Sequence, residues 1–180
     1  MRRTVRGIVA VAVLAGVVLG VASAADAKPK KQSTAKYAKT MCMTYSQLQT
    51  DFANYTGAIG NLDDTDTAGF SLQAVTQTNA FLDKVKTDEK TLQGVYPDIS
   101  NGKKVGSLLA TRPTEMNNIL GAALSQLQSG TGPAGPAVFK AALMTLPSKL
   151  SDPISKVKDQ GLINALQKER SCKDVIQVIR

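Results

Sequence analysis

The chain has 180 residues, which is enough for one ordinary domain and too few for two full ones. It contains no histidine or tryptophan, and only 4% of its residues are aromatic, which excludes histidine-based catalysis, histidine-ligated metal sites and an aromatic platform for stacking bases. The formal net charge of +8 suggests a polyanionic partner, but only if the charges belong to the folded part of the chain.

Residues 1–27 have the pattern of a secretory signal peptide, in a style typical of bacterial signals. Three arginines in the first six residues precede an uncharged apolar run over residues 7–21. Small residues then form two A-x-A patterns, and we expect cleavage after Ala27, with Ala24 as the alternative. Because residues 7–25 are uncharged and nearly reach the ~20 residues of a membrane span, an uncleaved anchor stays open, as does the choice between the Sec and Tat routes. Every alternative exports the remainder of the chain.

Residues 28–39 form a lysine-rich stretch without an acidic residue, which is typical of a flexible, solvated arm. Its lysines are Lys28, Lys30, Lys31, Lys36 and Lys39. After this arm, we expect residues 40–180 to form a single helical domain.

A long amphipathic helix is predicted first, because apolar residues recur every three or four positions over about six turns. This stripe consists of Tyr37, Met41, Tyr45, Leu48, Phe52, Tyr55 and Ile59. The sequence Gly60-Asn61 is expected to end the helix. An acidic turn follows, in which Asp64, Thr65 and Asp66 are candidate N-caps for the next helix.

The second helix is predicted over residues 68–95 and ends before Pro97. Its expected core stripe is Phe70, Ala74, Phe81, Val85, Leu92 and Tyr96, widened by Leu72, Val75 and Leu82. A third helix is predicted over residues 103–129. Pro113 either kinks it or begins a second helix, with Thr111 as the cap.

The last third of the chain is predicted to be a helix interrupted by proline. A Gly/Pro-rich loop ends near Pro136, and helical spacing then continues through Val138 and Phe139 to Leu146. Pro147 is expected to interrupt this helix, which restarts at residues 151–153 and runs to about residue 170. The apolar tail over residues 172–179 is either a last helical turn or an extended segment.

Two cysteines, Cys42 and Cys172, lie near opposite ends of the exported chain. An even number of cysteines in an exported protein predicts a disulfide, which here would place the first and last helices side by side. No alternating strand pattern or repeat is present. The sequence therefore predicts an all-α, up-and-down bundle of four-helix type, with some helices broken by proline and one disulfide joining its ends.

The motifs that would indicate a metal or catalytic site are incomplete. Asp64-x-Asp66 begins like a calcium-binding loop, but its twelfth position is Val75, where a bidentate glutamate is needed. Met41 and Met43 are two positions apart on a helix, so they point in different directions and cannot chelate one copper ion. We therefore assign no catalytic, cofactor-binding or metal-ligating residue, and predict that the protein is not an enzyme.

The charge is concentrated outside the predicted bundle. Residues 1–27 carry +2, residues 28–39 carry +5 and residues 40–180 carry +1. A nucleic-acid role therefore loses its main support, and the lysine-rich arm is interpreted as an electrostatic tether to anionic wall polymer or lipid headgroups. The predicted function is that of a secreted, envelope-associated, non-enzymatic helical bundle that binds a partner, such as another envelope protein. The alternative is a carrier that holds a small apolar ligand between its helices.

Overall fold

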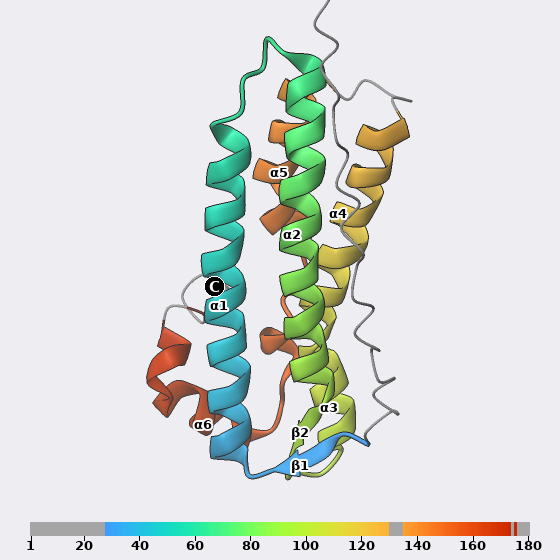
Figure 1. Cartoon of the computed structure of the whole chain (residues 1–180). Coiled ribbons are helices and arrows are strands. Elements are labelled where there is room, and N and C mark those ends of the chain that lie inside the picture. The colour runs from blue at the N-terminus through green and yellow to red at the C-terminus, as the bar shows by residue number, and fades with distance from the viewer. Residues whose placement is uncertain (1–27, 130–134, 174, 176–180) are drawn as a thin grey trace, which may run out of the picture.

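The chain folds into an all-α bundle, as its sequence predicts. The computed structural model describes residues 28–129, 135–173 and 175, so the predicted signal peptide with its cleavage sites at Ala24 and Ala27, and most of the apolar tail, lie outside the described residues. Figure 1 shows two long antiparallel helices, α1 and α2, with α4 and α5 completing the bundle beside them. Within the described residues, no helix is both long and apolar enough to cross a membrane.

The first two helices are α1, Thr34–Gly60, and α2, Thr67–Gln93. The Ser33 side chain caps α1 by accepting a hydrogen bond from the Lys36 N–H. The Asp66 carboxylate caps α2 by accepting from the Gly69 N–H at 2.9 Å, so it is the N-cap among the three predicted candidates.

The third helix is divided into α3, Gly102–Leu109, and α4, Thr111–Ser129. Pro113 lies in the first turn of α4, where its missing N–H costs no helical hydrogen bond, and it therefore belongs to the start of a new helix. The predicted cap is not seen, because Thr111 is already helical and its hydroxyl donates to the Leu108 carbonyl at 2.7 Å.

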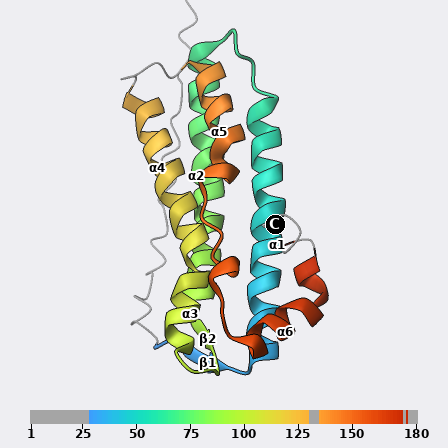
Figure 2. The ribbon, with the colours of Figure 1, turned by 180° about the vertical axis from the view of Figure 1, so that it is seen from behind.

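The last third differs from the prediction. Helix α5 spans Pro136–Lys149 and continues two residues past Pro147. The helix expected from residue 151 to about residue 170 is broken into a 3-10 turn η1, Ile154–Lys156, helix α6, Gln160–Lys168, and a second 3-10 turn η2, Arg170–Cys172. Figure 2 shows the thin connection that descends from α5 to α6. The break has a local cause, because the Asp159 carboxylate accepts from the Leu162 N–H and begins a new helix.

The predicted flexible arm is largely structured. Strand β1, Lys30–Gln32, pairs in parallel with strand β2, Val95–Pro97, and α1 begins immediately afterwards. Tyr37 is fully buried. The sequence predicts a flexible arm because this stretch is rich in lysine and has no acidic residue, whereas its order comes from backbone hydrogen bonds to a segment 65 positions away.

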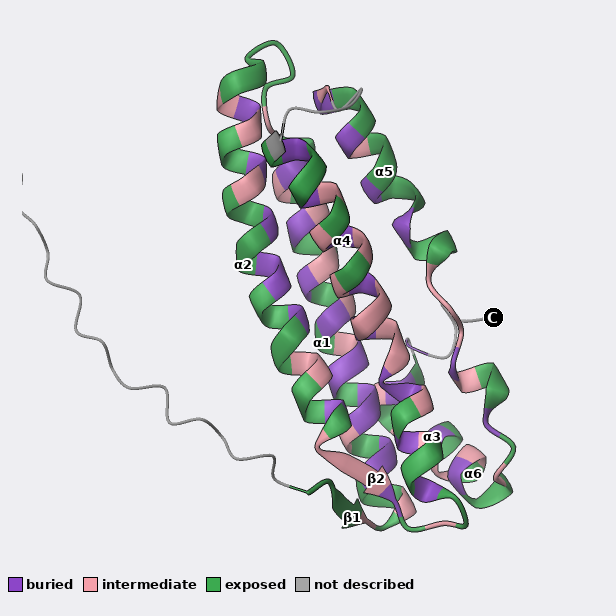
Figure 3. Cartoon of the chain, turned by 90° about the vertical axis from the view of Figure 1, so that its right-hand side faces the viewer, coloured by how far each residue is buried: buried purple, intermediate pink, exposed green. Residues whose placement is uncertain are grey.

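The interior consists of two apolar clusters, one above the other along the bundle. The upper core lies between α1, α2, α4 and α5, and includes Leu48, Tyr55, Ile59, Phe70, Phe81, Leu120, Phe139 and Leu146. The lower core joins the first half of α1 to α3 and the C-terminal segment, and includes Tyr37, Met41, Tyr45, Leu92, Leu109, Leu162, Leu166 and Val175. Figure 3 shows buried positions recurring along each helix. Among the large apolar residues on the predicted helical stripes, Leu72 and Val138 are exposed.

The predicted disulfide is present and lies in the lower core. Cys42 of α1 is bonded to Cys172 of η2, with their Cα atoms 4.9 Å apart, and both residues are fully buried. The bridge fixes the C-terminal segment against the first half of α1.

Candidate functional site

One end of the bundle collects basic residues from three segments that are far apart in the sequence. These segments are residues 28–39, residues 90–104 and residues 158–173, and we call the surface that they form the basic end. They contribute five, three and four basic residues, against only three acidic ones. In Figure 1 this is the end where β1, β2, α3 and α6 meet.

The three carboxylates of the basic end already have local partners. Asp98 pairs with Lys31, with 2.7 Å between Nζ and Oδ1, and Asp159 caps α6. Glu169 accepts hydrogen bonds from the Ser171 backbone N–H and hydroxyl, which hold the pKa of Glu169 below its usual range. Among the described residues, Lys31 is the only basic side chain of this end that forms an ion pair. The other cations remain accessible to a partner.

All five lysines predicted as a tether belong to the basic end, and all five are exposed. The structure places Lys30 and Lys31 on β1, and Lys36 and Lys39 on the first turns of α1. It adds basic residues that sequence reasoning missed, including Lys103, whose Nζ lies 5.7 Å from the centre of the Tyr96 ring. The sequence alone does not reveal these additional basic residues as part of one surface, because only the fold brings the three segments together.

The opposite end of the bundle is acidic. Residues 57–72 carry Asp63, Asp64 and Asp66 and no basic residue. Lys140 from α5 pairs with Asp64 and donates to the carbonyls of Gly60 and Leu62 at 3.0 and 2.9 Å. The charge is therefore polarised along the long axis, which the nearly neutral total for residues 40–180 concealed.

The three carboxylates of the acidic turn between α1 and α2 are all engaged in local contacts. Asp63 accepts from the Thr65 N–H and hydroxyl at 2.8 and 2.7 Å, Asp64 binds Lys140, and Asp66 caps α2. Each carboxylate thus serves the turn itself. In the parts of the chain that the structure describes, no group of three His, Cys, Asp or Glu side chains is placed to hold a metal ion.

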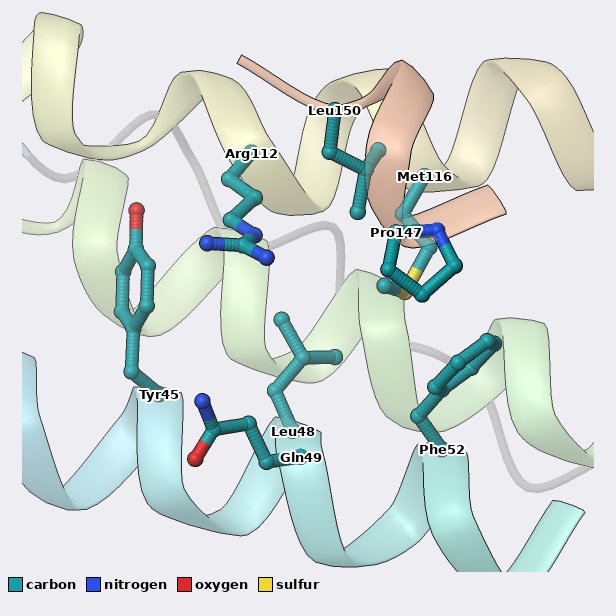
Figure 4. Close-up of a pocket in the computed structure, with 8 residues that line it drawn as sticks. All are labelled: Tyr45, Leu48, Gln49, Phe52, Arg112, Met116, Pro147 and Leu150. Carbon is teal, nitrogen blue, oxygen red and sulfur yellow. The ribbon is translucent and has the colours of Figure 1, made fainter. Parts of the chain in front are cut away.

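A second feature is a groove of about 260 Å³ between α1, α4 and the end of α5. We call it the α1/α4/α5 groove. It is lined by Tyr45, Leu48, Gln49, Phe52, Arg112, Met116, Pro147 and Leu150. Figure 4 shows that its polar side chains gather at one end, around Tyr45 and Arg112, while Phe52, Met116 and Pro147 lie at the other.

The polar end of the groove contains an arginine without a protein partner. Among the described residues, no carboxylate pairs with Arg112, and no hydrogen bond to its guanidinium is formed. The nearby Tyr45 hydroxyl is already used, because it donates to the Leu109 carbonyl at 2.7 Å, and burial raises the pKa of Tyr45. Glu115 is likewise engaged, accepting from the Ser151 N–H and hydroxyl at 2.8 Å each.

Two carboxylates also approach each other between α1 and α2. Asp51 is buried, and it accepts hydrogen bonds from Lys84 Nζ at 2.6 Å and from Gln47 Nε2 at 2.9 Å. Burial alone would raise the pKa of Asp51, but these two contacts outweigh it and lower that pKa. On the next turn of α2, the Oδ2 atom of Asp88 is buried without a partner. Burial and then the charge of Asp51 raise the pKa of Asp88 to about 6.

This raised pKa predicts a pH-dependent stability. Because the folded chain binds the Asp88 proton more tightly than the unfolded chain does, the stability that Asp88 contributes falls as the pH rises from about 4 to about 6, and stays low above that. We expect Asp88→Asn to raise the free energy of unfolding at pH 7.5 and to leave it nearly unchanged at pH 3.5. Urea denaturation at the two pH values measures this. The matched control is Asp83→Asn on the exposed face of α2, which should change little at either pH.

Comparison with protein-family models, with curated proteins and with solved structures gave no match for this chain. The basic end and the α1/α4/α5 groove are the two surfaces of the described chain that suit a partner or a ligand.

Proposed function

We propose that this protein is an exported, non-catalytic helical bundle that binds the anionic membrane surface of the cell envelope through its basic end. The observation that carries the proposal is that three distant segments place twelve basic residues, against three acidic ones, at one end of the bundle. The opposite end has the reverse polarity, so an anionic surface would both attract the molecule and orient it.

The strength of such binding follows from the number of exposed cations. A lysine or arginine held near an anionic bilayer contributes about 1 kcal/mol, and the attraction falls off within a Debye length of about 10 Å at 0.1 M salt. Here the cations are fixed by β1, by α1 and by the β2–α3 connection. A preorganised surface loses less conformational entropy on binding than a flexible arm would.

A lipid surface is favoured over a wall polymer because of where the preceding segment joins the bundle. Lys28, which directly follows the predicted signal peptide over residues 1–27, lies at the basic end beside β1. An apolar segment that engages the membrane during export would deliver this end of the bundle to the headgroups first.

The test compares two triple variants that remove the same charge. In Lys36→Gln/Lys39→Gln/Lys103→Gln the cations leave the basic end, whereas the matched control removes them elsewhere. The control is Lys86→Gln/Lys149→Gln/Lys156→Gln. The measured quantity is the affinity for phosphatidylglycerol-containing vesicles relative to phosphatidylcholine vesicles, for protein produced from the full-length chain. We expect at least a tenfold loss for the first variant and little change for the control.

Two results would contradict this proposal. Equal losses in both variants would mean that net charge alone matters and that no particular surface binds. Binding to poly(glycerol phosphate) without binding to the anionic vesicles would make the wall polymer, and not the membrane, the partner.

The second candidate function is the transport or storage of a small apolar ligand between the helices. The α1/α4/α5 groove favours it, because five of its eight lining residues are apolar and it opens beside the upper core. Native mass spectrometry of the purified protein tests this candidate directly, since a carrier should retain a ligand of defined mass.

A further inference from the structure

We propose that the α1/α4/α5 groove binds a single-chain amphipathic anion, with its anionic head at Arg112 and its apolar chain directed toward Phe52 and Met116. This inference rests on the second candidate function and gives the chemical class of the ligand. The ligand chemistry is that of a medium-chain carboxylate.

The polar end of the groove favours an anion because its cation forms no ion pair with the described residues. Arg112 forms no ion pair within the described chain, and its guanidinium can donate two parallel hydrogen bonds to a carboxylate. Two carboxylates that act electrostatically on the neighbouring Tyr45 hydrogen-bond to other groups. Glu115 is held by Ser151, and Asp152 accepts from the backbone N–H groups of residues 154 and 155.

Gln49 extends this polar end from the other side. Its side chain projects from α1 beside the Tyr45 ring in Figure 4, and it makes no hydrogen bond within the described chain. The amide can therefore donate to one oxygen of a bound head group while Arg112 holds the head. The Tyr45 hydroxyl does not contribute, since Leu109 already accepts its proton.

The rest of the groove suits a hydrocarbon chain. Leu48 and Leu150 lie between the polar end and the Phe52 end, where Met116 and Pro147 close the wall (Figure 4). Met116 is unbranched and adapts to an irregular apolar ligand. The volume of about 260 Å³ is near the lower limit of ~300–1,000 Å³ for ligand sites, which fits one short chain and excludes a two-chain lipid.

The experiment compares three ten-carbon probes by isothermal titration calorimetry on protein produced from the full-length chain. Sodium decanoate carries the anion, decanol has the same chain without a charge, and decyltrimethylammonium carries a cation. We expect one decanoate per chain, bound at least tenfold more tightly than decanol, and no comparable binding of the cation.

Variants then assign the site. Arg112→Gln should weaken decanoate at least tenfold while leaving decanol binding unchanged, which also shows that the groove is still folded. The matched control is Arg170→Gln at the basic end, which should bind decanoate like the unaltered protein. The triple variant Lys36→Gln/Lys39→Gln/Lys103→Gln should do the same, so the groove and the membrane surface are tested independently.

Several outcomes would overturn the inference. Equal affinity for decanoate and decanol would leave a carrier of neutral ligands but no anion site, and equal effects of the Arg112 and Arg170 variants would place the anion elsewhere. Absence of binding at millimolar decanoate would reject the groove as a ligand site.

Discussion

Replacing Cys42 and Cys172 together by alanine should lower the free energy of unfolding by about 4–5 kcal/mol. The bridge joins residues 130 positions apart, and a cross-link that closes so long a loop removes much of the conformational freedom of the unfolded chain. This is a large part of the ~5–15 kcal/mol that stabilises a typical domain. The measurement is guanidinium denaturation followed by far-ultraviolet circular dichroism.

The control for this prediction is the unaltered protein in a reductant. If the covalent link is what matters, the reduced protein and the double variant should unfold within about 1 kcal/mol of each other, because alanine removes only one sulfur atom at each position. A double variant as stable as the oxidised protein would contradict the prediction.

Removal of the disulfide should also destabilise some parts of the chain more than others. The C-terminal segment packs on the first half of α1 through Leu162 and Leu166, and the bridge is its covalent link to that helix. Without the bridge, we expect the amides of residues 160–172 to exchange with solvent well before those in the middle of α2. Hydrogen exchange read by mass spectrometry distinguishes this local opening from uniform destabilisation.

Gly102→Ala should destabilise the protein by about 2–3 kcal/mol or more. Gly102 begins α3 directly after Asn101, which has a φ of 60°, in the turn that brings α3 back against β2. A Cβ atom at Gly102 would overlap the carbonyl oxygen of Pro97, and this obstacle is backbone, so it cannot move aside as a side chain could. Relief of the overlap requires the turn and β2 to shift. Thermal and urea denaturation measure the loss.

The same substitution at Gly121 provides a control of opposite sign. Gly121 lies inside α4, and apart from the backbone of its own helix nothing lies within 4 Å of the position that a Cβ atom would take, so alanine fits there and improves helix propensity. Gly121→Ala should therefore stabilise the protein by about 0.5–1 kcal/mol. If both variants were neutral, the tight approach at Gly102 would not be a real constraint.

The helices could be predicted from the sequence because their apolar spacing is regular over many turns. All seven stripe residues of α1 are buried or half-buried, and α2 begins at an N-cap that the acidic turn contains. Prediction failed where a single residue competes with the spacing. The Asp159 cap divides the last segment into η1 and α6, although the sequence predicts one helix from residue 151 to about residue 170.

The two candidate functional features were harder to predict because both depend on the fold. The lysines of residues 28–39 were conspicuous, but their order comes from pairing with β2, a three-residue strand with no alternation to mark it. Arg112 has no motif around it. It becomes a candidate anion-binding residue only because α1 and the end of α5 form an apolar groove beside it and no carboxylate among the described residues pairs with it.

The division of the interior into two cores sets an order of events during synthesis. The upper core needs residues only as far as Leu150, whereas the lower core also needs Val157, Leu162, Cys172 and Val175. A chain made from its N-terminus can thus assemble the upper core before the C-terminal segment is present to pack on the first turns of α1. Cys42 meets its partner last, and the basic end becomes a fixed surface only after this final segment has docked.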